Sequence, residues 1–259
     1  MNQTTFVTAL YNIHRETNGD GRKWTDYLHW FKDTLTLPFP MVIYISQEET
    51  QLLEMIQNHR PMNVPTKILF SPIPYQSYEP VFKEILSQHE YQSKMMNSNR
   101  VECILPMYNI IQYSKFQWLK EIAEMNPFQT DYFFWVDAGI SRFISKHLYN
   151  RISSNVSLPK GKLMIQHNHL LNHYPVTEAY LWDSQCLMCG TMFGGDKEIL
   201  VRFAKIMDEE LKERVSQGWI NNEQILLAYL YHKKYKELYH LIYNNTHQHL
   251  ILFERLFIL

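Results

Sequence analysis

The sequence predicts an α/β protein whose central, mainly parallel sheet is flanked by helices. Short apolar runs alternate along the chain with longer amphipathic segments, which is the order of parallel β–α–β units. The run Tyr132–Val136 is apolar or aromatic throughout, as expected for a strand that is buried on both faces of such a sheet. With 259 residues, of which 46% are hydrophobic, the chain can bury one large core. No repeat or linker interrupts it, so we predict a single domain over residues 1–259.

Five further apolar runs are predicted strands. They cover residues 6–10, 41–45, 66–70, 162–166 and 187–193. Gly194 and Gly195 follow the last run and are expected to connect it to a helix. Paired glycines let a ligand approach the backbone, and the start of the next helix offers free N–H groups. A plain tight turn would use the same two residues.

Amphipathic segments between these runs predict helices. They cover residues 24–35, 47–58, 110–125, 196–217 and 221–231, and a further helix followed by a turn is expected within 81–100. Ser46 with Glu49, and Asn221 with Gln224, have the spacing of a capping box, so helices should begin directly after Ser46 and at Asn221. The polar, charged residues 15–22 indicate an exposed loop.

Composition and charge exclude several classes of protein. The net charge of −1 provides no basic field, so no nucleic acid is expected as a partner. Three cysteines are too few for a disulfide framework, and neither glycine-rich nucleotide motif is present. The start lacks the basic and apolar regions of a signal peptide, and no run reaches the roughly 18 apolar residues that span a bilayer. We therefore expect a cytoplasmic protein without a transmembrane segment, and leave peripheral membrane association open.

Asp137 is the strongest candidate for a functional residue. It directly follows the buried run 132–136, and the carboxyl edge of a parallel sheet is where open α/β folds bind ligands. A carboxylate at this edge can hold Mg²⁺ or Mn²⁺ together with the phosphates of a substrate. The alternative is that Asp137 caps a following helix through Ala138. The strand that precedes it favours a functional role.

Three other parts of the chain carry side chains that could act in binding or catalysis. Glu223 and Gln224 fall in the first turn of a predicted helix, where a carboxylate can take a proton or bind a sugar, or can simply complement the helix dipole. His247 and His249 could complete a metal site, although surface histidines explain them equally well. Lys115 could neutralise phosphate or could be a solvated helix lysine.

Several stretches together resemble a known family. They are TFVTALY at residues 5–11, WTDYL at 24–28, LPFPMVIY at 37–44, SKFQWL at 114–119, NPFQTD at 126–131 and WVDAGISRF at 135–143. The pattern covers most of the chain and resembles the WlaTC/HtrL (YibB-like) family of bacterial proteins. That family is similar to GT-A type glycosyltransferases, so the resemblance implies a GT-A-like, Rossmann-like fold. It also implies a transferase that moves a sugar from a nucleotide diphosphate donor, with a UDP-sugar favoured, to a hydroxyl of a glycan in polysaccharide biosynthesis.

The resemblance also implies roles for individual residues. The donor would be bound by Thr8, Tyr11, Asn12, Lys115, Trp135, Asp137, Ala138 and Gly139. The transferred sugar and the acceptor would lie against Phe193, Gly194 and Gly195, and catalysis would depend on Glu223 and Gln224. A divalent cation, Mn²⁺ or Mg²⁺, would be held by Asp137, His247 and His249. The nucleotide-binding part would cover about residues 1–140, and the acceptor side about 141–259.

One position departs from the pattern of such enzymes. Asp137-Ala138-Gly139 takes the place of the DxD motif, so Gly139 stands where the second acid is expected. A second metal ligand would then come from His247 or His249, or the dependence on metal would be weak. The missing acid also motivates an alternative, a catalytically inactive nucleotide-sugar-binding protein. The many tyrosine and tryptophan residues motivate another, a structural protein of a polysaccharide assembly pathway.

Overall fold

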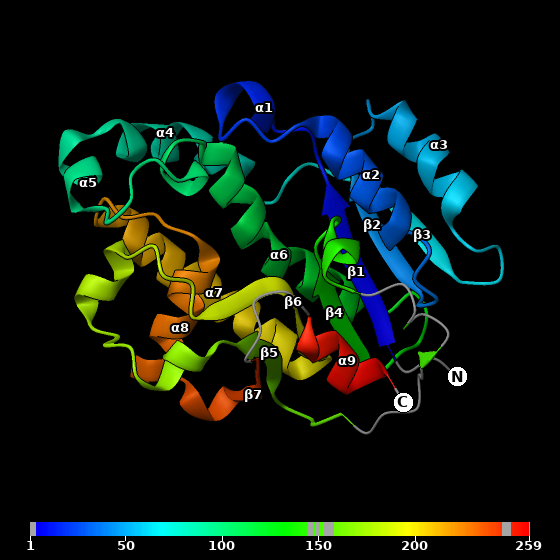
Figure 1. Cartoon of the computed structure of the whole chain (residues 1–259). Helices are drawn as coiled ribbons and strands as arrows, with labels where there is room; N and C mark the ends of the chain where they lie inside the picture. Colours follow the sequence, from blue (N-terminus) through cyan, green and yellow to red (C-terminus); the bar gives the residue numbers. More distant parts are fainter. Residues whose placement is uncertain (1–3, 145–147, 149–150, 153–157, 245–249, 259) are drawn as a thin grey trace.

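The strands of the computed structural model form one continuous sheet (Figure 1). The structure describes residues 4–144, 148, 151–152, 158–244 and 250–258. Within them the strands are β1 (Thr4–Leu10), β2 (Met41–Ile45), β3 (Thr66–Phe70), β4 (Tyr132–Val136), β5 (Leu163–His167), β6 (Met188–Asp196) and β7 (Tyr239–Tyr243). Their order across the sheet is β3-β2-β1-β4-β6-β5-β7. The α/β fold with a mainly parallel sheet is therefore confirmed.

One strand runs against the others. β1 pairs in parallel with β2 and β4, and β2 pairs in parallel with β3. β6 lies between β4 and β5 and is antiparallel to both, while β5 and β7 are again parallel. This reversal brings the start of β6, rather than its end, to the edge of the sheet where β1 and β4 end.

Helices cover both faces of this sheet. The α-helices are α1 (Arg15–Asn18), α2 (Trp24–Thr34), α3 (Thr50–His59), α4 (Glu79–Ser87), α5 (His89–Lys94), α6 (Pro106–Met125), α7 (Lys197–Ser216), α8 (Glu223–Lys233) and α9 (Ile251–Phe257). Short 3₁₀ helices are η1 (Gln76–Tyr78), η2 (Val101–Cys103), η3 (Ile140–Phe143), η5 (His169–Asn172), η6 (Glu178–Trp182) and η7 (Lys236–Leu238). No described helix is both long enough and apolar enough to cross a membrane.

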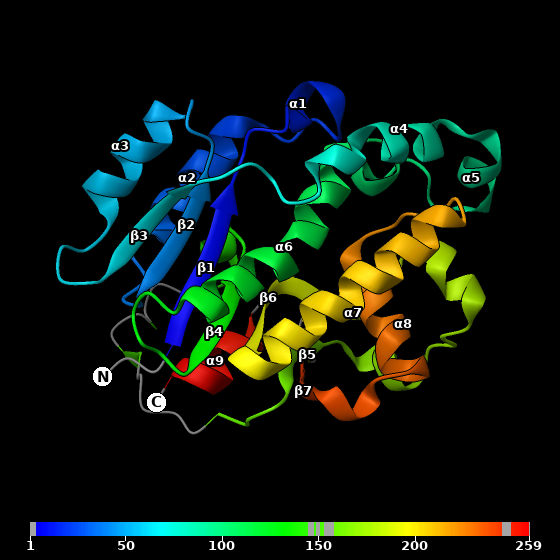
Figure 2. The ribbon, with the colours of Figure 1, turned by 180° about the vertical axis from the view of Figure 1, so that it is seen from behind.

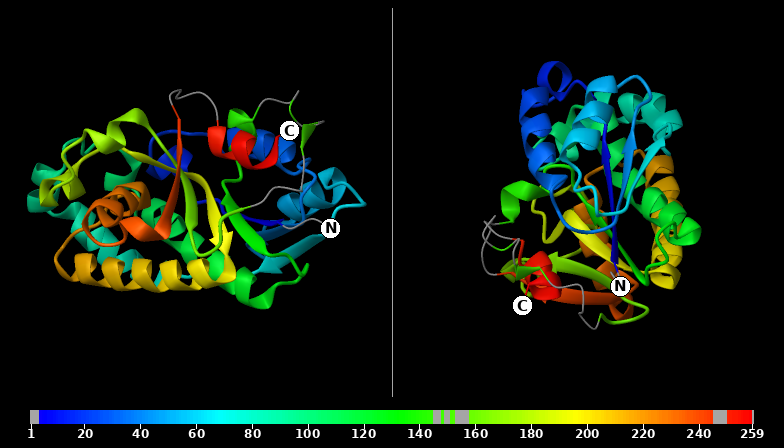
Figure 3. Two further views of the ribbon diagram at one scale, coloured as in Figure 1. Left: turned by 90° about the horizontal axis from the view of Figure 1, so that it is seen from below. Right: turned by 90° about the vertical axis from the view of Figure 1, so that its right-hand side faces the viewer.

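The alternation of side chains along the strands divides the core into two layers. On one face, Phe6 and Phe134 pack with residues of α2, α3 and α9. On the other face, Val7 and Trp135 pack with residues of α4, α6, α7 and α8. Figures 1 and 2 show these two helical layers from the front and from behind, and Figure 3 shows α9 and α7 on opposite sides of the sheet. Both faces of β4 are buried, which explains its unbroken apolar sequence.

Several predicted boundaries were wrong. Helix α3 begins at Thr50, and Ser46 does not cap it but accepts a hydrogen bond from the backbone N–H of Glu48. Asn222 rather than Asn221 caps α8, through its side chain and the N–H of Gln224. The region 81–100 contains parts of two helices, α4 and α5, and the prediction missed β7 and α9. These elements are short, so their periodic pattern is weak.

Candidate active site

Asp137 lies at the carboxyl edge of the sheet, directly after β4, as predicted. Val7 pairs with Trp135, so Asp137 is level with the end of β1 and close to the residues that follow it. Its backbone N–H donates to the carbonyl of Thr191 at 2.9 Å, which ties this point to the first part of β6. The indole Nε1 of Trp135 donates to Oδ1 of Asp137 at 2.7 Å and fixes the orientation of the carboxylate.

Lys115 is buried beside this carboxylate. It lies on α6, is 1% exposed, and its Nζ is 3.1 Å from Oδ1 of Asp137. The same ammonium donates to the carbonyl of Gly190 at 3.0 Å and to Oε1 of Glu223 at 3.0 Å. Three elements far apart in the sequence therefore meet at one buried cation.

Glu223 lies behind Lys115, away from the surface. It is the first residue of α8 and is fully buried, and its second oxygen, Oε2, has no hydrogen-bond partner among the described residues. Gly190 makes this arrangement possible, because a Cβ at residue 190 would overlap Oε1 of Glu223. Gln224, the next residue, accepts a hydrogen bond from the N–H of Gly190 at 3.1 Å.

The charges of this cluster affect one another strongly. Burial alone would lower the pKa of Lys115, but the carboxylates of Asp137 and Glu223 outweigh burial and raise it. Burial raises the pKa of Glu223, and the ammonium of Lys115 opposes that rise. Lys115 thus stays protonated, and Glu223 ionises less readily than a glutamic acid in water.

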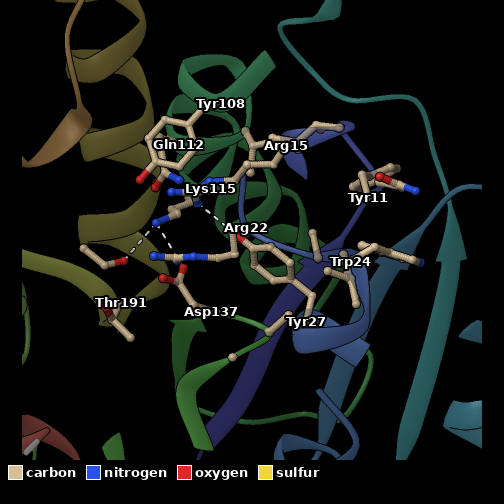
Figure 4. A pocket seen from close by; sticks show the side chains of 18 of the residues that line it. Tyr11, Arg15, Arg22, Trp24, Tyr27, Tyr108, Gln112, Lys115, Asp137 and Thr191 are labelled. Atoms are coloured by element: carbon tan, nitrogen blue, oxygen red, sulfur yellow. Dashed lines mark hydrogen bonds and ion pairs between the residues drawn. The ribbon is translucent and has the colours of Figure 1, made fainter. Parts of the chain in front are cut away.

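A cavity of about 320 Å³ opens in front of Asp137 and Lys115 (Figure 4). Residues that follow β1, the N-terminal part of α2, the first half of α6 and the segment after β4 line it. Its charged lining residues are Arg15, Glu16, Arg22, Lys115, Asp137 and Arg142. Four cationic side chains against two carboxylates make this a favourable site for an anionic ligand.

Arg15 organises the segment between β1 and α2. Its guanidinium makes two hydrogen bonds to Asp20, of 2.6 and 2.7 Å, and a third to the hydroxyl of Tyr27 at 2.7 Å. It also lies over the ring of Tyr108, at 4.8 Å from the ring centre. These contacts hold residues 15–22 against α6 as a wall of the cavity, whereas the sequence suggested only an exposed loop.

A second, wider cavity of about 790 Å³ lies beyond the ends of β2 and β3. Residues 11–14 line both cavities and separate them. Tyr11 is held rigidly there: its hydroxyl donates to the carbonyl of Ser71 at 2.7 Å, and its ring stacks on Trp118 with centres 5.8 Å apart. The charged residues of the second cavity are Glu48, Glu49 and Glu79, so it is not cationic like the first.

Comparison with known proteins gives the family. A family model described as "Bacterial protein of unknown function (HtrL_YibB)" matches residues 2–255. The chain belongs to the HtrL_YibB family. No curated protein matches it. Among solved structures it is similar to the crystal structure of mouse xyloside xylosyltransferase 1 in its apo form, with 8% sequence identity and a TM-score of 0.45 over 92% of this chain and 84% of that chain. The family description assigns no activity, and a similarity this low transfers none.

The structure brings together most of the residues that the family resemblance implied for the donor. Tyr11, Asn12, Lys115, Trp135, Asp137, Ala138, Gly139 and also Gln224 line the first cavity. Thr8 does not, because it is fully buried within β1. Glu223 does not line the cavity either, so its place behind Lys115 does not fit contact with an acceptor. His247 and His249 lie outside the described residues.

The prediction that Gly194 and Gly195 connect a strand to a helix was wrong. Both lie inside β6 rather than in a connection, and they pair with Phe134 and Phe133 in the interior of the sheet. A Cβ on Gly194 would overlap β4, and one on Gly195 would overlap Ile199 of α7. Close packing therefore requires these glycines. Phe193 is fully buried beside them and stacks on Phe116 of α6, with ring centres 4.9 Å apart.

Several residues of the site were not predicted. Arg22 and Tyr108 are cavity residues whose sequence neighbours form no recognisable motif, and Arg142 lies in the stretch WVDAGISRF but was assigned no role there. Gly190 is a single glycine within an apolar run, a pattern that suggests at most a close backbone approach. The polar segment after β1 was the available clue for Arg22, because residues that follow parallel strands gather at one edge of the sheet.

Asp137 could ligate a divalent cation if the remaining ligands came from a bound phosphate. Its Oδ1 is engaged by Trp135 and Lys115, while Oδ2 has no hydrogen bond to another described residue. Among the described residues no group of three His, Cys, Asp or Glu side chains could hold a metal ion. Mg²⁺ is commonly held by one or two carboxylates together with substrate phosphates, so the donor set suits a cation that arrives with a phosphate ligand.

Replacing Gly190 by alanine should destabilise the protein by about 1–3 kcal/mol, because the added methyl group overlaps the carboxylate of Glu223. Urea unfolding would measure the change. In the double variant Gly190→Ala/Glu223→Ala the overlap is gone, so the two losses should not add. Strictly additive losses would contradict the proposed contact.

Proposed function

We propose that this protein is a glycosyltransferase that moves a sugar from a nucleotide diphosphate donor, with a UDP-sugar favoured, to a hydroxyl of a glycan. The observation that carries the proposal is the pairing of Asp137 with the buried ammonium of Lys115 in a cavity rich in cationic side chains. Such a cavity at the carboxyl edge of an α/β sheet suits an extended anionic ligand. The family resemblance adds independent support.

The charges match the chemistry of sugar transfer. When the bond between the sugar and the diphosphate breaks, its electron pair stays on the departing diphosphate oxygen, while the acceptor hydroxyl forms the new bond and releases a proton. Fixed cations that face this oxygen stabilise the developing charge without reorganisation. Lys115 is held in one position by three oxygen atoms, so it is suited to this role.

The carboxylate of Asp137 has two tasks in this proposal. Through Oδ1 it keeps Lys115 in place, and through Oδ2 it would hold a Mn²⁺ or Mg²⁺ ion. When bound, such a cation supplies additional positive charge to the diphosphate. Trp135 keeps the carboxylate oriented for both tasks by its hydrogen bond to Oδ1.

The second cavity suits the nucleoside part of the donor. It adjoins the first cavity across residues 11–14. Of these, Tyr11 and Asn12 are the two for which the resemblance implies contact with the nucleobase and ribose. Its lining offers the exposed ring of Phe70 and neutral polar groups of Asn18, Gln47 and Gln76. An uncharged base and ribose fit such a surface better than a phosphate does.

Glu223 is a positioning residue in this mechanism. Because it is buried behind Lys115, we assign to it the orientation of the ammonium and not contact with the acceptor. Gln224 fixes the neighbouring backbone of Gly190, whose carbonyl also holds Lys115.

Calorimetric titration with UDP, GDP and uridine, each with and without Mn²⁺, tests the donor. We expect a nucleoside diphosphate to bind at least about tenfold more tightly than uridine, since the cationic cavity contacts only the phosphates. Release of UDP or GDP from a panel of sugar donors would then report turnover. Binding without any turnover would favour an inactive nucleotide-sugar-binding protein, and the absence of both would contradict the proposal.

A further inference from the structure

Arg22 and Arg142 both line the first cavity, and their positive charges act on each other. Arg22 precedes α2, and Arg142 belongs to η3. Burial lowers the pKa of Arg142 and the positive charge of Arg22 lowers it further, while the carboxylate of Asp137 opposes this fall. Among the described residues neither forms an ion pair with a carboxylate. Two like charges in one concave surface are unfavourable until an anion joins them.

The guanidinium of Arg15, in contrast, has partners within the chain. It is paired with both oxygens of Asp20 and with the hydroxyl of Tyr27. Arg22 also lowers the pKa of Asp20, but only through its charge and a backbone hydrogen bond, since Arg15 occupies both carboxylate oxygens. Unlike Arg15, the guanidinium groups of Arg22 and Arg142 make no ion pair with a described carboxylate, so both can bind an anion that is not part of the chain.

Arg142 is held in position by its neighbours. Its guanidinium lies 4.1 Å from the centre of the ring of Trp30 and 4.9 Å from that of Phe143. Its Nε donates to the carbonyl of Gly139 at 3.1 Å. Stacking on Trp30 fixes the guanidinium plane, so little conformational freedom is lost when an anion binds.

The glycine at residue 139 is explained by this arrangement. A Cβ there would lie 3.3 Å from Nε of Arg142 and 3.3 Å from Cε3 of Trp30, so any side chain would press on both. Where a DxD motif would place its second carboxylate, this chain therefore places a guanidinium. The local charge is reversed from negative to positive, which favours direct contact with an anionic oxygen.

From this we infer that Arg22 and Arg142 form a phosphoryl-binding subsite of the first cavity, together with the rings of Trp24 and Tyr27, which also line it. The fork of donors on a guanidinium matches the oxygens of a phosphoryl group. The adjacent rings offer apolar faces on which a sugar ring can pack. Binding of a phosphoryl group at this subsite does not require that sugar transfer takes place, but the identity of its carrier rests on the proposed function.

The phosphoryl group has two possible carriers, the diphosphate of the donor and a phosphorylated acceptor. Titration of inorganic pyrophosphate and UDP into the Arg22→Gln and Arg142→Gln variants tests the first. Each substitution should weaken binding at least about tenfold, because it removes a charged donor, while uridine binding stays unchanged. Titration of a hexose phosphate into protein saturated with UDP tests the second carrier. If the acceptor carries the phosphoryl group, the glutamine variants should bind UDP as tightly as the original protein does and should bind the hexose phosphate more weakly.

Matched variants make the result specific. Arg202→Gln, an exposed arginine of α7 outside the cavity, makes the same charge change and should leave all affinities within about twofold of the original protein. Arg22→Lys and Arg142→Lys should recover part of the affinity, since the charge returns without the fork. Circular dichroism would show that the variants fold.

The outcomes separate this inference from the proposed function. If pyrophosphate, UDP and hexose phosphate all bind the glutamine variants as they bind Arg202→Gln, the subsite is wrong, even where UDP binding still depends on Asp137 and Lys115. If pyrophosphate binds through the two arginines but no nucleotide binds more tightly than pyrophosphate, the subsite stands and the proposed donor is wrong.

Discussion

Replacing Asp137 by asparagine is expected to lower the rate of donor cleavage about 10²–10³-fold, which is the usual effect of removing one electrostatic contact at a reacting group. Asparagine has the same shape and keeps an acceptor for Nε1 of Trp135. It loses the negative charge that orients Lys115 and the carboxylate oxygen available to a cation. The rate of UDP or GDP release at saturating donor is the measurement, and the melting temperature should change little because Lys115 keeps Glu223 and Gly190.

Asp131→Asn is the matched control for this substitution. Asp131 is exposed and precedes β4, so it lies at the opposite end of the same strand from Asp137. Its replacement removes the same charge and should leave the rate within about twofold, since exposed charges at this distance are screened by salt. Equal rates for the two variants would remove Asp137 from the proposed mechanism.

The central strand and Asp137 were predictable because the information is local. Five consecutive apolar residues indicate burial on both faces, and the first polar residue after them must lie at the edge of the sheet. The partners of Asp137 were not predictable in this way. Lys115 is buried because α6 packs against β6 and α8, and the residues that hold it, Gly190 and Glu223, are 75 and 108 positions away in the sequence.

The structural role of the glycines also could not be predicted from the sequence. Gly194 and Gly195 look like a turn in the sequence, but the antiparallel pairing of β6 with β4 places them inside the sheet. Gly190 is a single glycine without a motif, and Gly139 stands where a DxD motif would have its second acid, yet each leaves room for a charged side chain of the site, Glu223 and Arg142 respectively. A glycine needed for close packing and one needed for a turn are alike in sequence, and only the tertiary structure distinguishes them.

Replacing Lys115 by methionine should have the largest effect on stability. Methionine preserves the length of the side chain but leaves the fully buried Glu223 without its cation. Removing one partner of a buried ion pair typically costs about 3–5 kcal/mol. For a domain of this size the melting temperature should fall by roughly 10 °C. Thermal unfolding monitored by circular dichroism at pH 7 would measure the change.

The loss should also depend on pH, with a sign that follows from Glu223. The pKa of Glu223 is raised above its ordinary value of 4.5. Between pH 4.5 and the raised pKa, the folded protein therefore holds a proton that the unfolded chain has released. Stability therefore falls as the pH rises from 4.5 through the raised pKa. Without Lys115 this pKa rises further, so the stability of Lys115→Met should be closest to that of the original protein at the acid end of the range and should fall further below it as the pH rises.

The double variant Lys115→Met/Glu223→Gln separates lost charge from lost packing. Glutamine cannot ionise, so the pH dependence of the difference should disappear, and part of the stability should return because no buried carboxylate remains unpaired. The double variant should nevertheless transfer no sugar at an appreciable rate, because the cation beside Asp137 is still missing. If the double variant regains stability but not activity, Glu223 acts by positioning Lys115. If the double variant is active, the arginines alone supply the positive charge at the diphosphate.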